Sequence, residues 1–126
     1  MSPNNAYNVY TQNNVGIESP AKLIEMLYEG ILRFNTQAKH AIKLGDIEKK
    51  TYWINRANAV FFELIHSIDM SQGQVSEYLN GLYTYQLQTL AAANIESDAS
   101  KLDEVNGVIK GLLEAWREKT RVAQPV

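Results

Sequence analysis

The side chains best suited to metal chemistry are the two histidines, His40 and His66. Glu63 precedes His66 by three positions, and this Glu-x-x-His spacing is one half of the motif that holds two metal ions in some four-helix bundles. A complete site needs a second such motif and a glutamate from each of two further helices. Gln37 stands where His40 needs its glutamate. We therefore expect no metal site, and we expect His66 to be a structural residue.

No other catalytic pattern is present. The sequence has no glycine-rich phosphate loop, nucleophile elbow or catalytic triad signature. It also has no cysteine, which excludes disulfides, thiolate ligands and cysteine nucleophiles. The carboxylates are scattered over polar helix faces, without a pair in an evident pocket. We therefore predict that the protein is not an enzyme and has no catalytic, cofactor-binding or metal-binding residues.

Composition limits the remaining classes of function. With 126 residues, 45% of them hydrophobic and 21% charged, the chain fits one globular domain with one core. A net charge of −2 and a pI near 5.7 argue against binding to nucleic acid, which requires a basic face. We find no signal peptide and no apolar run of the roughly 18 residues that span a membrane. These features predict a cytosolic protein that does not insert into membranes.

The elements that position these side chains are four amphipathic helices. Apolar residues recur with helical spacing over four segments: about 20–44, 47–69, 74–93 and 98–121. Ser19 and Pro20 form an N-cap and a first helical position, Gly45 ends the first helix, and Asp46 caps the second. The stretches DMSQGQ and NIESDAS break the pattern, and Ser97 or Asp98 can cap the fourth helix.

The apolar stripes predict which residues form the core. In the first two helices these are Leu23, Ile24, Leu27, Ile31, Phe34, Ala41, Ile42, Ile47, Ile54, Phe61, Ile65 and Ile68. In the last two they are Val75, Leu79, Leu82, Tyr83, Gln86, Leu90, Leu102, Val105, Ile109, Leu112 and Trp116. Four such helices with short connections predict an all-α, antiparallel, up-down-up-down four-helix bundle. We assign residues 1–18 to a flexible, extended N-terminal arm, 19–122 to the bundle and 123–126 to a C-terminal tail.

Two helices carry more apolar residues than one core face requires. The second helix has an additional stripe made of Trp53, Ala57, Val60 and Leu64. In the first helix, Tyr28 and Leu32 widen the apolar sector. A helix of a small bundle normally keeps a polar outer face, so these wide sectors indicate either deep burial or a binding surface.

The fourth helix offers a different kind of surface. Gly107 and Gly111 lie four residues apart, opposite the apolar stripe, and are bordered by Val108 and Ala115. Each glycine in a helix interior costs about 1 kcal/mol relative to alanine. Their side-chain-free face is expected to let a partner approach closely, and the alternative is that the two glycines are merely tolerated.

The arm is unusual for a polar leader because it carries apolar side chains. Tyr7, Val9, Tyr10 and Val15 stand among asparagines, a glutamine and a serine. Solvated tails generally lack aromatic residues. These side chains therefore need a surface to cover or a partner to contact.

Several segments together resemble one family, the flagellar secretion chaperone FliS. They are ESPAKLIEMLYEGIL at 18–32, GDIEKK at 45–50, LYTYQLQTLAAANIESDASKLDEV at 82–105 and LLEAWRE at 112–118. The resemblance covers almost the whole chain. One departure is SQGQV at 71–75, where the family usually has a Lys-Gly-Gly-Glu-like turn.

The resemblance implies a function. Members of the family are cytosolic helical bundles that bind the disordered C-terminal segment of flagellin, prevent its premature polymerisation and assist its delivery to the flagellar type III export apparatus. A one-to-one complex is expected, and a co-chaperone or flagellar regulator can share the surface. The resemblance implies that the arm covers part of the apolar surface and moves when flagellin arrives. Alternatively, Tyr7 and Tyr10 contact the client themselves.

Two alternatives remain open at the level of sequence. One is a bundle that binds a metal or small ligand, and the other is a homodimeric structural bundle in which the excess apolar surface is the dimer interface.

Overall fold

The computed structural model describes residues 19–123, and within them it is entirely helical apart from short connections. The elements are α2 (Pro20–Leu44), α3 (Ile47–His66), the 3-10 turn η1 (Met70–Gln72), α4 (Gln74–Glu96) and α5 (Ala99–Ala123). The predicted all-α four-helix bundle is confirmed. The predicted arm at 1–18, and residues 124–126 of the predicted tail, lie outside the described residues.

Both ends of α2 and the start of α3 follow from local sequence. At the start of α2, the Ser19 side chain accepts a hydrogen bond from the Lys22 amide at 3.1 Å. Gly45 ends α2 with a φ of 72°, a left-handed conformation that glycine adopts without a Cβ clash. Asp46 then caps α3 by accepting from the Lys49 amide at 3.0 Å. Each of these residues has the role that the sequence predicts.

Two helix ends differ from the prediction. The second helix, expected to reach 69, ends at His66, because Asp69 instead caps η1 and accepts from the Ser71 amide at 3.0 Å. The third helix, expected to end at 93, continues to Glu96. Lys50 explains this extension, since its buried ammonium group donates to the Asn94 carbonyl at 2.7 Å and thereby satisfies the end of α4.

The fourth helix begins where one of the two predicted caps places it. Asp98 accepts a hydrogen bond from the Ser100 amide at 2.9 Å, as an N-cap does. Ser97 has a φ of 50° and ends α4 in the left-handed region. Its hydroxyl accepts a second hydrogen bond from the Lys50 ammonium at 2.8 Å, which holds this strained residue in place.

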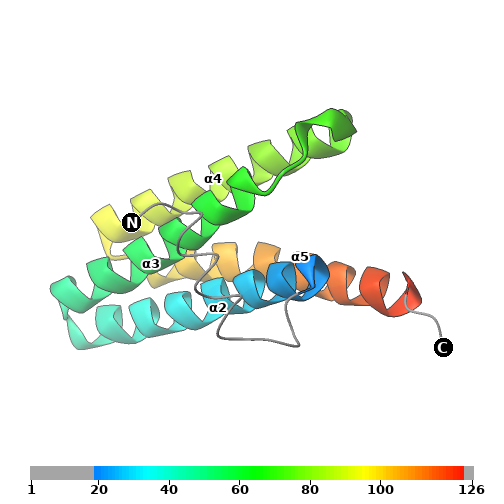
Figure 1. The fold of residues 1–126 in the computed structure, drawn as a ribbon. Helices are drawn as coiled ribbons and strands as arrows, with labels where there is room; N and C mark the ends of the chain where they lie inside the picture. The colour runs from blue at the N-terminus through cyan, green and yellow to red at the C-terminus, as the bar shows by residue number, and fades with distance from the viewer. Residues whose placement is uncertain (1–18, 124–126) are drawn as a thin grey trace.

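The helices form a closed ring in which α2 packs on α3 and α5, and α4 packs on α3 and α5. Contacts between distant residues show that neighbours run in opposite directions (Figure 1). The Trp116 indole, late in α5, donates to the Ala21 carbonyl at the start of α2 at 2.8 Å. The pair of α3 and α4 separates from the pair of α2 and α5 toward the end that carries the start of α2 (Figure 1).

The core lies along the bundle axis. Its largest fully buried apolar side chains are Ile31, Ile54, Phe61, Leu64, Leu90, Leu102, Val105 and Ile109. Two polar pairs cross it. The Tyr28 and Tyr83 hydroxyls share a hydrogen bond of 2.7 Å, and the Asn35 amide nitrogen donates to Asn106 Oδ1 at 2.9 Å. Burial raises the pKa of both tyrosines, so both hydroxyls stay protonated and can donate.

Some of the predicted core positions are wrong. Ile47 is 68% exposed and Val75 is 64% exposed, because both lie in the first turn of a helix, beyond the last layer of core contacts. On α2, Leu23, Leu27 and Phe34 are only half-buried. The buried face of α2 is instead formed by Tyr28, Gly30, Ile31, Asn35, Ala38 and Ala41.

Candidate functional site

The main surface feature is a groove between the N-terminal half of α2 and the C-terminal half of α3. Its volume is about 570 Å³, within the usual range for ligand sites. Its walls carry Leu23, Ile24, Met26, Leu27, Glu29, Gly30, Arg33 and Phe34 from α2, and Arg56, Ala59, Val60, Glu63 and Ser67 from α3. The groove lies where the two helix pairs separate (Figure 1). An apolar groove of this size is suited to receive apolar side chains of a partner.

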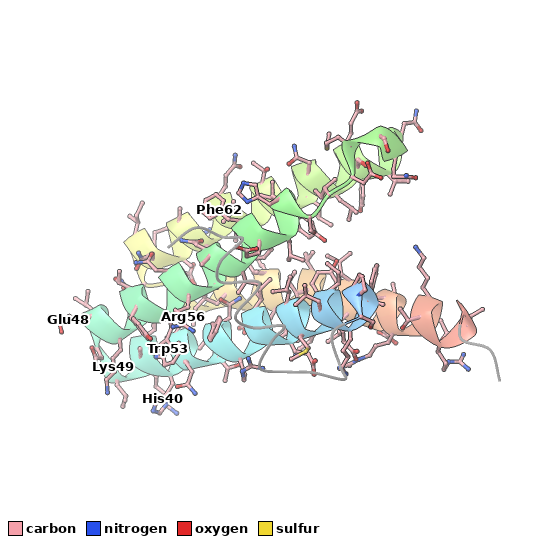
Figure 2. The ribbon with its side chains drawn as sticks, in the orientation of Figure 1. His40, Glu48, Lys49, Trp53, Arg56 and Phe62 are labelled. Carbon is pink, nitrogen blue, oxygen red and sulfur yellow. The ribbon has the colours of Figure 1, made fainter. Side chains whose placement is uncertain are left out.

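The end of the groove nearest the α2–α3 turn is built from aromatic rings and guanidinium groups. Phe34 stacks on Trp53, with ring centroids 5.8 Å apart. The guanidinium carbons of Arg33 and Arg56 lie 5.8 and 5.0 Å from the centroid of the Phe34 ring. Arg56 also donates to the Tyr52 hydroxyl at 3.3 Å. Trp53 and Arg56 lie on the side of α3 that faces α2 (Figure 2).

Two acidic side chains in the first half of α2, Glu25 and the groove residue Glu29, are paired with α5. Arg117 of α5 donates to Glu25 at 2.7 Å and to Glu29 at 3.2 Å. The hydrogen bond from Arg117 holds the pKa of Glu25 below its usual value. These contacts tie the start of α2 to the end of α5.

The predicted binding residues do not form one surface. Val60 lines the groove, and Trp53 supports its closed end through Phe34. Leu32 lies in a second hollow, of about 500 Å³, between α2 and α5. The other residues of that hollow are mostly charged: Lys110, Glu114, Arg117, Glu118 and Arg121, together with Leu113. Its lining therefore suits an apolar partner less well than the groove does.

Three of the predicted binding residues lie in the core. Tyr28, Ala57 and Leu64 are 4%, 0% and 0% exposed. In this arrangement of the helices a ligand on the surface cannot reach them. Tyr28 is drawn inward because its hydroxyl has a buried partner in Tyr83, which offsets the cost of removing that hydroxyl from water.

The α5 residues lie on another side of the bundle. Gly107, Gly111 and Ala115 are exposed and Val108 is half-buried. A Cβ added at either glycine meets no atom of the described residues within 4 Å. This face belongs to α5 and the groove belongs to α2 and α3. The arm residues Tyr7, Val9, Tyr10 and Val15 lie outside the described residues.

Residues 19–123 contain no group of three or more histidine, aspartate or glutamate side chains placed to hold a metal ion. His40, near the end of α2, and His66, the last residue of α3, are both exposed. They come from opposite ends of the bundle, and His40 is labelled close to the α2–α3 turn in Figure 2. Over the same described part of the chain, no helix is both long enough and apolar enough to span a membrane.

Among the groove residues that sequence reasoning missed, Gly30, Arg33 and Arg56 carry signals that could have indicated them. Gly30 is a buried glycine inside α2. Like the two glycines of α5, it occupies a helix interior, where glycine is less favourable than alanine, and this cost could have indicated a functional position. Arg33 and Arg56 are each close in sequence to an aromatic residue that they contact, Phe34 in one case and Tyr52 in the other. The spacing of Tyr52 and Arg56, four residues apart on one helix face, could have indicated this contact.

The fold and the groove define a class of protein: a four-helix bundle with an apolar groove on its surface. Comparison with known proteins makes this specific. The family model described as "Flagellar protein FliS" matches residues 3–123. The chain belongs to the FliS family.

Named relatives agree with this assignment. The flagellar secretion chaperone FliS of Campylobacter jejuni is 56% identical over 119 residues, which cover 94% of this chain and 93% of the relative. The protein of the same name from Bacillus subtilis is 32% identical and covers 94% of this chain and 88% of its own. That of Salmonella typhimurium is 30% identical, covering 87% and 83%. These relatives are named as chaperones, a class without catalytic activity, so the protein is not an enzyme.

Proposed function

We propose that this protein is a cytosolic export chaperone that binds the disordered C-terminal segment of flagellin. In this role it prevents premature polymerisation and assists delivery to the flagellar type III export apparatus. The observation that carries the proposal is the open apolar groove between α2 and α3 in a chain of the FliS family.

The physical requirement for such a client is a large apolar surface. Fixing the backbone of one residue costs about 1–2 kcal/mol, so ordering a segment of many residues needs extensive burial. Coupled folding typically buries on the order of 1,000–3,000 Å². The groove supplies one part of this surface, and the smooth face of α5 with Gly107 and Gly111 is a second contact region for a segment that wraps around the bundle.

The test is co-purification with a C-terminal fragment of flagellin. Val60→Asp places a charge in the groove and is expected to abolish the complex. Val75→Asp is the control, because it makes the same change at an exposed valine of α4, away from both the groove and the α5 face. Circular dichroism confirms that both variants are folded. If Val60→Asp retains the complex, or if both variants lose it equally, the groove is not the principal client site.

The arm provides a second test of the proposed function. In our proposal, Tyr7, Val9, Tyr10 and Val15 cover the groove until the client displaces them. Removal of residues 1–18 is then expected to increase the binding of a hydrophobic dye and to strengthen flagellin binding. Weaker flagellin binding would instead support direct contact of Tyr7 and Tyr10 with the client. Light scattering of the wild-type protein, with and without the fragment, separates a one-to-one complex from a homodimer.

A further inference from the structure

The closed end of the groove holds two positive charges that lack an acidic partner. Arg33 and Arg56 both contact the ring of Phe34, at 5.8 and 5.0 Å from its centroid to their guanidinium carbons. Among residues 19–123, neither forms an ion pair with a carboxylate. Arg33 and Arg56 thus bring two positive charges to one aromatic ring, and both attract an anion that approaches this end of the groove.

The nearest candidate within the helix is already engaged. Glu29 precedes Arg33 by four residues, the spacing at which glutamate and arginine pair along a helix. Glu29 instead accepts from Arg117 of α5 at 3.2 Å. Glu63 lines the groove seven residues beyond Arg56, which is about 10 Å along α3. Both arginines are therefore held by aromatic contacts and remain available to an anion.

From these contacts we infer that the groove selects a helical client segment that carries an acidic side chain, which Arg33 and Arg56 bind. This inference rests on the proposed function and names the chemistry of the client at that site. From Leu23 to Phe34 the groove spans about 16 Å, or three helical turns. The segment presents apolar anchors at helical spacing to Leu23, Leu27 and Val60, and a carboxylate at the end of the groove nearest the α2–α3 turn.

The arm of this chain cannot supply that carboxylate. Residues 1–17 contain no aspartate and no glutamate. Glu18 directly precedes Ser19, and the rise of α2 puts about 21 Å between Ser19 and Arg33. This distance exceeds the reach of a glutamate side chain. A client with an acidic residue thus gains an interaction that the arm lacks, and this difference favours exchange of the arm for the client.

Binding of a synthetic peptide with the flagellin C-terminal sequence of the same organism tests the inference, using the full chain and fluorescence anisotropy. The double variant Arg33→Gln/Arg56→Gln is expected to bind about tenfold more weakly, since it loses charge-assisted hydrogen bonds. Its affinity is also expected to depend less on salt than that of the wild type. The control Lys43→Gln/Lys49→Gln removes two exposed charges that line neither the groove nor the α5 face, and its affinity is expected to match the wild type.

The peptide identifies the source of the carboxylate. One acidic-to-amide replacement in the peptide is expected to weaken wild-type binding about tenfold and to leave binding by the double variant unchanged. Amidation of the peptide's C-terminus is expected to have no effect, and a tenfold loss on amidation would overturn the assignment to a side chain.

Different results would contradict the acidic-client inference and the proposed chaperone function. Equal affinity and equal salt dependence for the wild type and the double arginine variant would overturn the inference and leave the proposed function intact. Absence of peptide binding by the wild type would overturn the proposed function, and the inference with it.

Discussion

The two faces of α2 differ in a way that residue type alone does not indicate. The face turned to the bundle axis carries Tyr28 and Asn35, which are 4% and 0% exposed. The face turned to the groove carries Leu23, Leu27 and Phe34, all half-buried. Two polar residues of α2 thus lie deeper than three large apolar residues of the same helix.

The difference follows from the partners that each face meets. Tyr28 and Asn35 are buried because Tyr83 of α4 and Asn106 of α5 offer them hydrogen bonds in the core. The leucines and Phe34 remain accessible because α3 leans away from α2 at that end (Figure 1). Because polar pairs occupy part of the core-facing side of α2, several of its apolar side chains lie at the surface instead. These apolar side chains line the groove in which we propose that the client binds.

The strongest test of the comparison deletes side-chain volume on each face. Ile31→Ala, at a fully buried position, is expected to reduce the free energy of unfolding by about 2–5 kcal/mol. Leu27→Ala on the groove face is expected to cost about 1 kcal/mol or less, because its side chain is already partly in water. Urea denaturation measures both. Equal losses would show that the two faces are not energetically distinct.

A smaller effect is expected from the buried tyrosine pair. Tyr28→Phe leaves the Tyr83 hydroxyl buried without its partner, which costs about 1–3 kcal/mol of stability. Changing both tyrosines to phenylalanine is expected to recover part of that loss, because no orphaned hydroxyl then remains. Thermal denaturation of the two single variants and the double variant measures this coupling. Flagellin binding is expected to persist in Tyr28→Phe. Loss of flagellin binding in a Tyr28→Phe variant that remains folded would instead indicate that Tyr28 contacts the client.

Substitution of the helix glycine in the groove is expected to raise the stability of the protein while it lowers the affinity for flagellin. Among residues 19–123, a Cβ at Gly30 meets only Arg33 and Phe34 atoms, at 3.8 and 3.9 Å, which is ordinary van der Waals contact that Gly30→Ala can accommodate. It is expected to stabilise α2 by up to about 1 kcal/mol and to weaken flagellin binding, because it adds bulk to the groove. Gly81→Ala, at an exposed position of α4 outside the groove and the α5 face, is the matched control for helix propensity. If Gly107→Ala weakens binding and Gly30→Ala does not, the client lies on α5 and not in the groove.

The smallest effect concerns the ion pair that joins α2 to α5. Arg117 lowers the pKa of Glu25 in the folded state, so the pair stabilises the fold above the usual pKa of 4.5 and loses this contribution as pH falls through the lowered value. Arg117→Gln is expected to lower the melting temperature slightly at neutral pH, and this difference from wild type is expected to disappear in acid, once the pH has fallen below the lowered pKa of Glu25. A difference that persists in acid would assign the effect to packing of the arginine side chain.

Much of the fold follows from local sequence. Ser19, Pro20, Gly45 and Asp46 define the α2–α3 hairpin by cap chemistry, which depends only on neighbouring residues. Helical spacing likewise predicts Leu102, Val105 and Ile109 as core residues of α5, and all three are fully buried. The later end of α4 was missed because Lys50, which satisfies it, is more than 40 residues away in sequence.

The candidate site was less predictable, because it depends on how helices lean and not on where they begin. The wide apolar sectors correctly indicated excess apolar surface on the first two helices, and Val60 lies in the groove. The same reasoning placed Ala57 and Leu64 on that surface, although both are 0% exposed. Residues of one apolar sector differ in the direction in which they leave the helix axis. The sequence does not determine how the helix is rotated about that axis, so it does not determine which of these residues face the core and which face the groove.

The sequence by itself determined the helices, their order, the excess of apolar residues and the resemblance to the FliS family, because caps, periodicity and motifs are properties of neighbouring residues. Only the tertiary structure decided which apolar residues face a partner. It joined Tyr28 to Tyr83 and Asn35 to Asn106, and so took α2's polar side chains into the core. It also brought Arg33 and Arg56 to the same ring of Phe34, a contact between separate helices that no local pattern encodes.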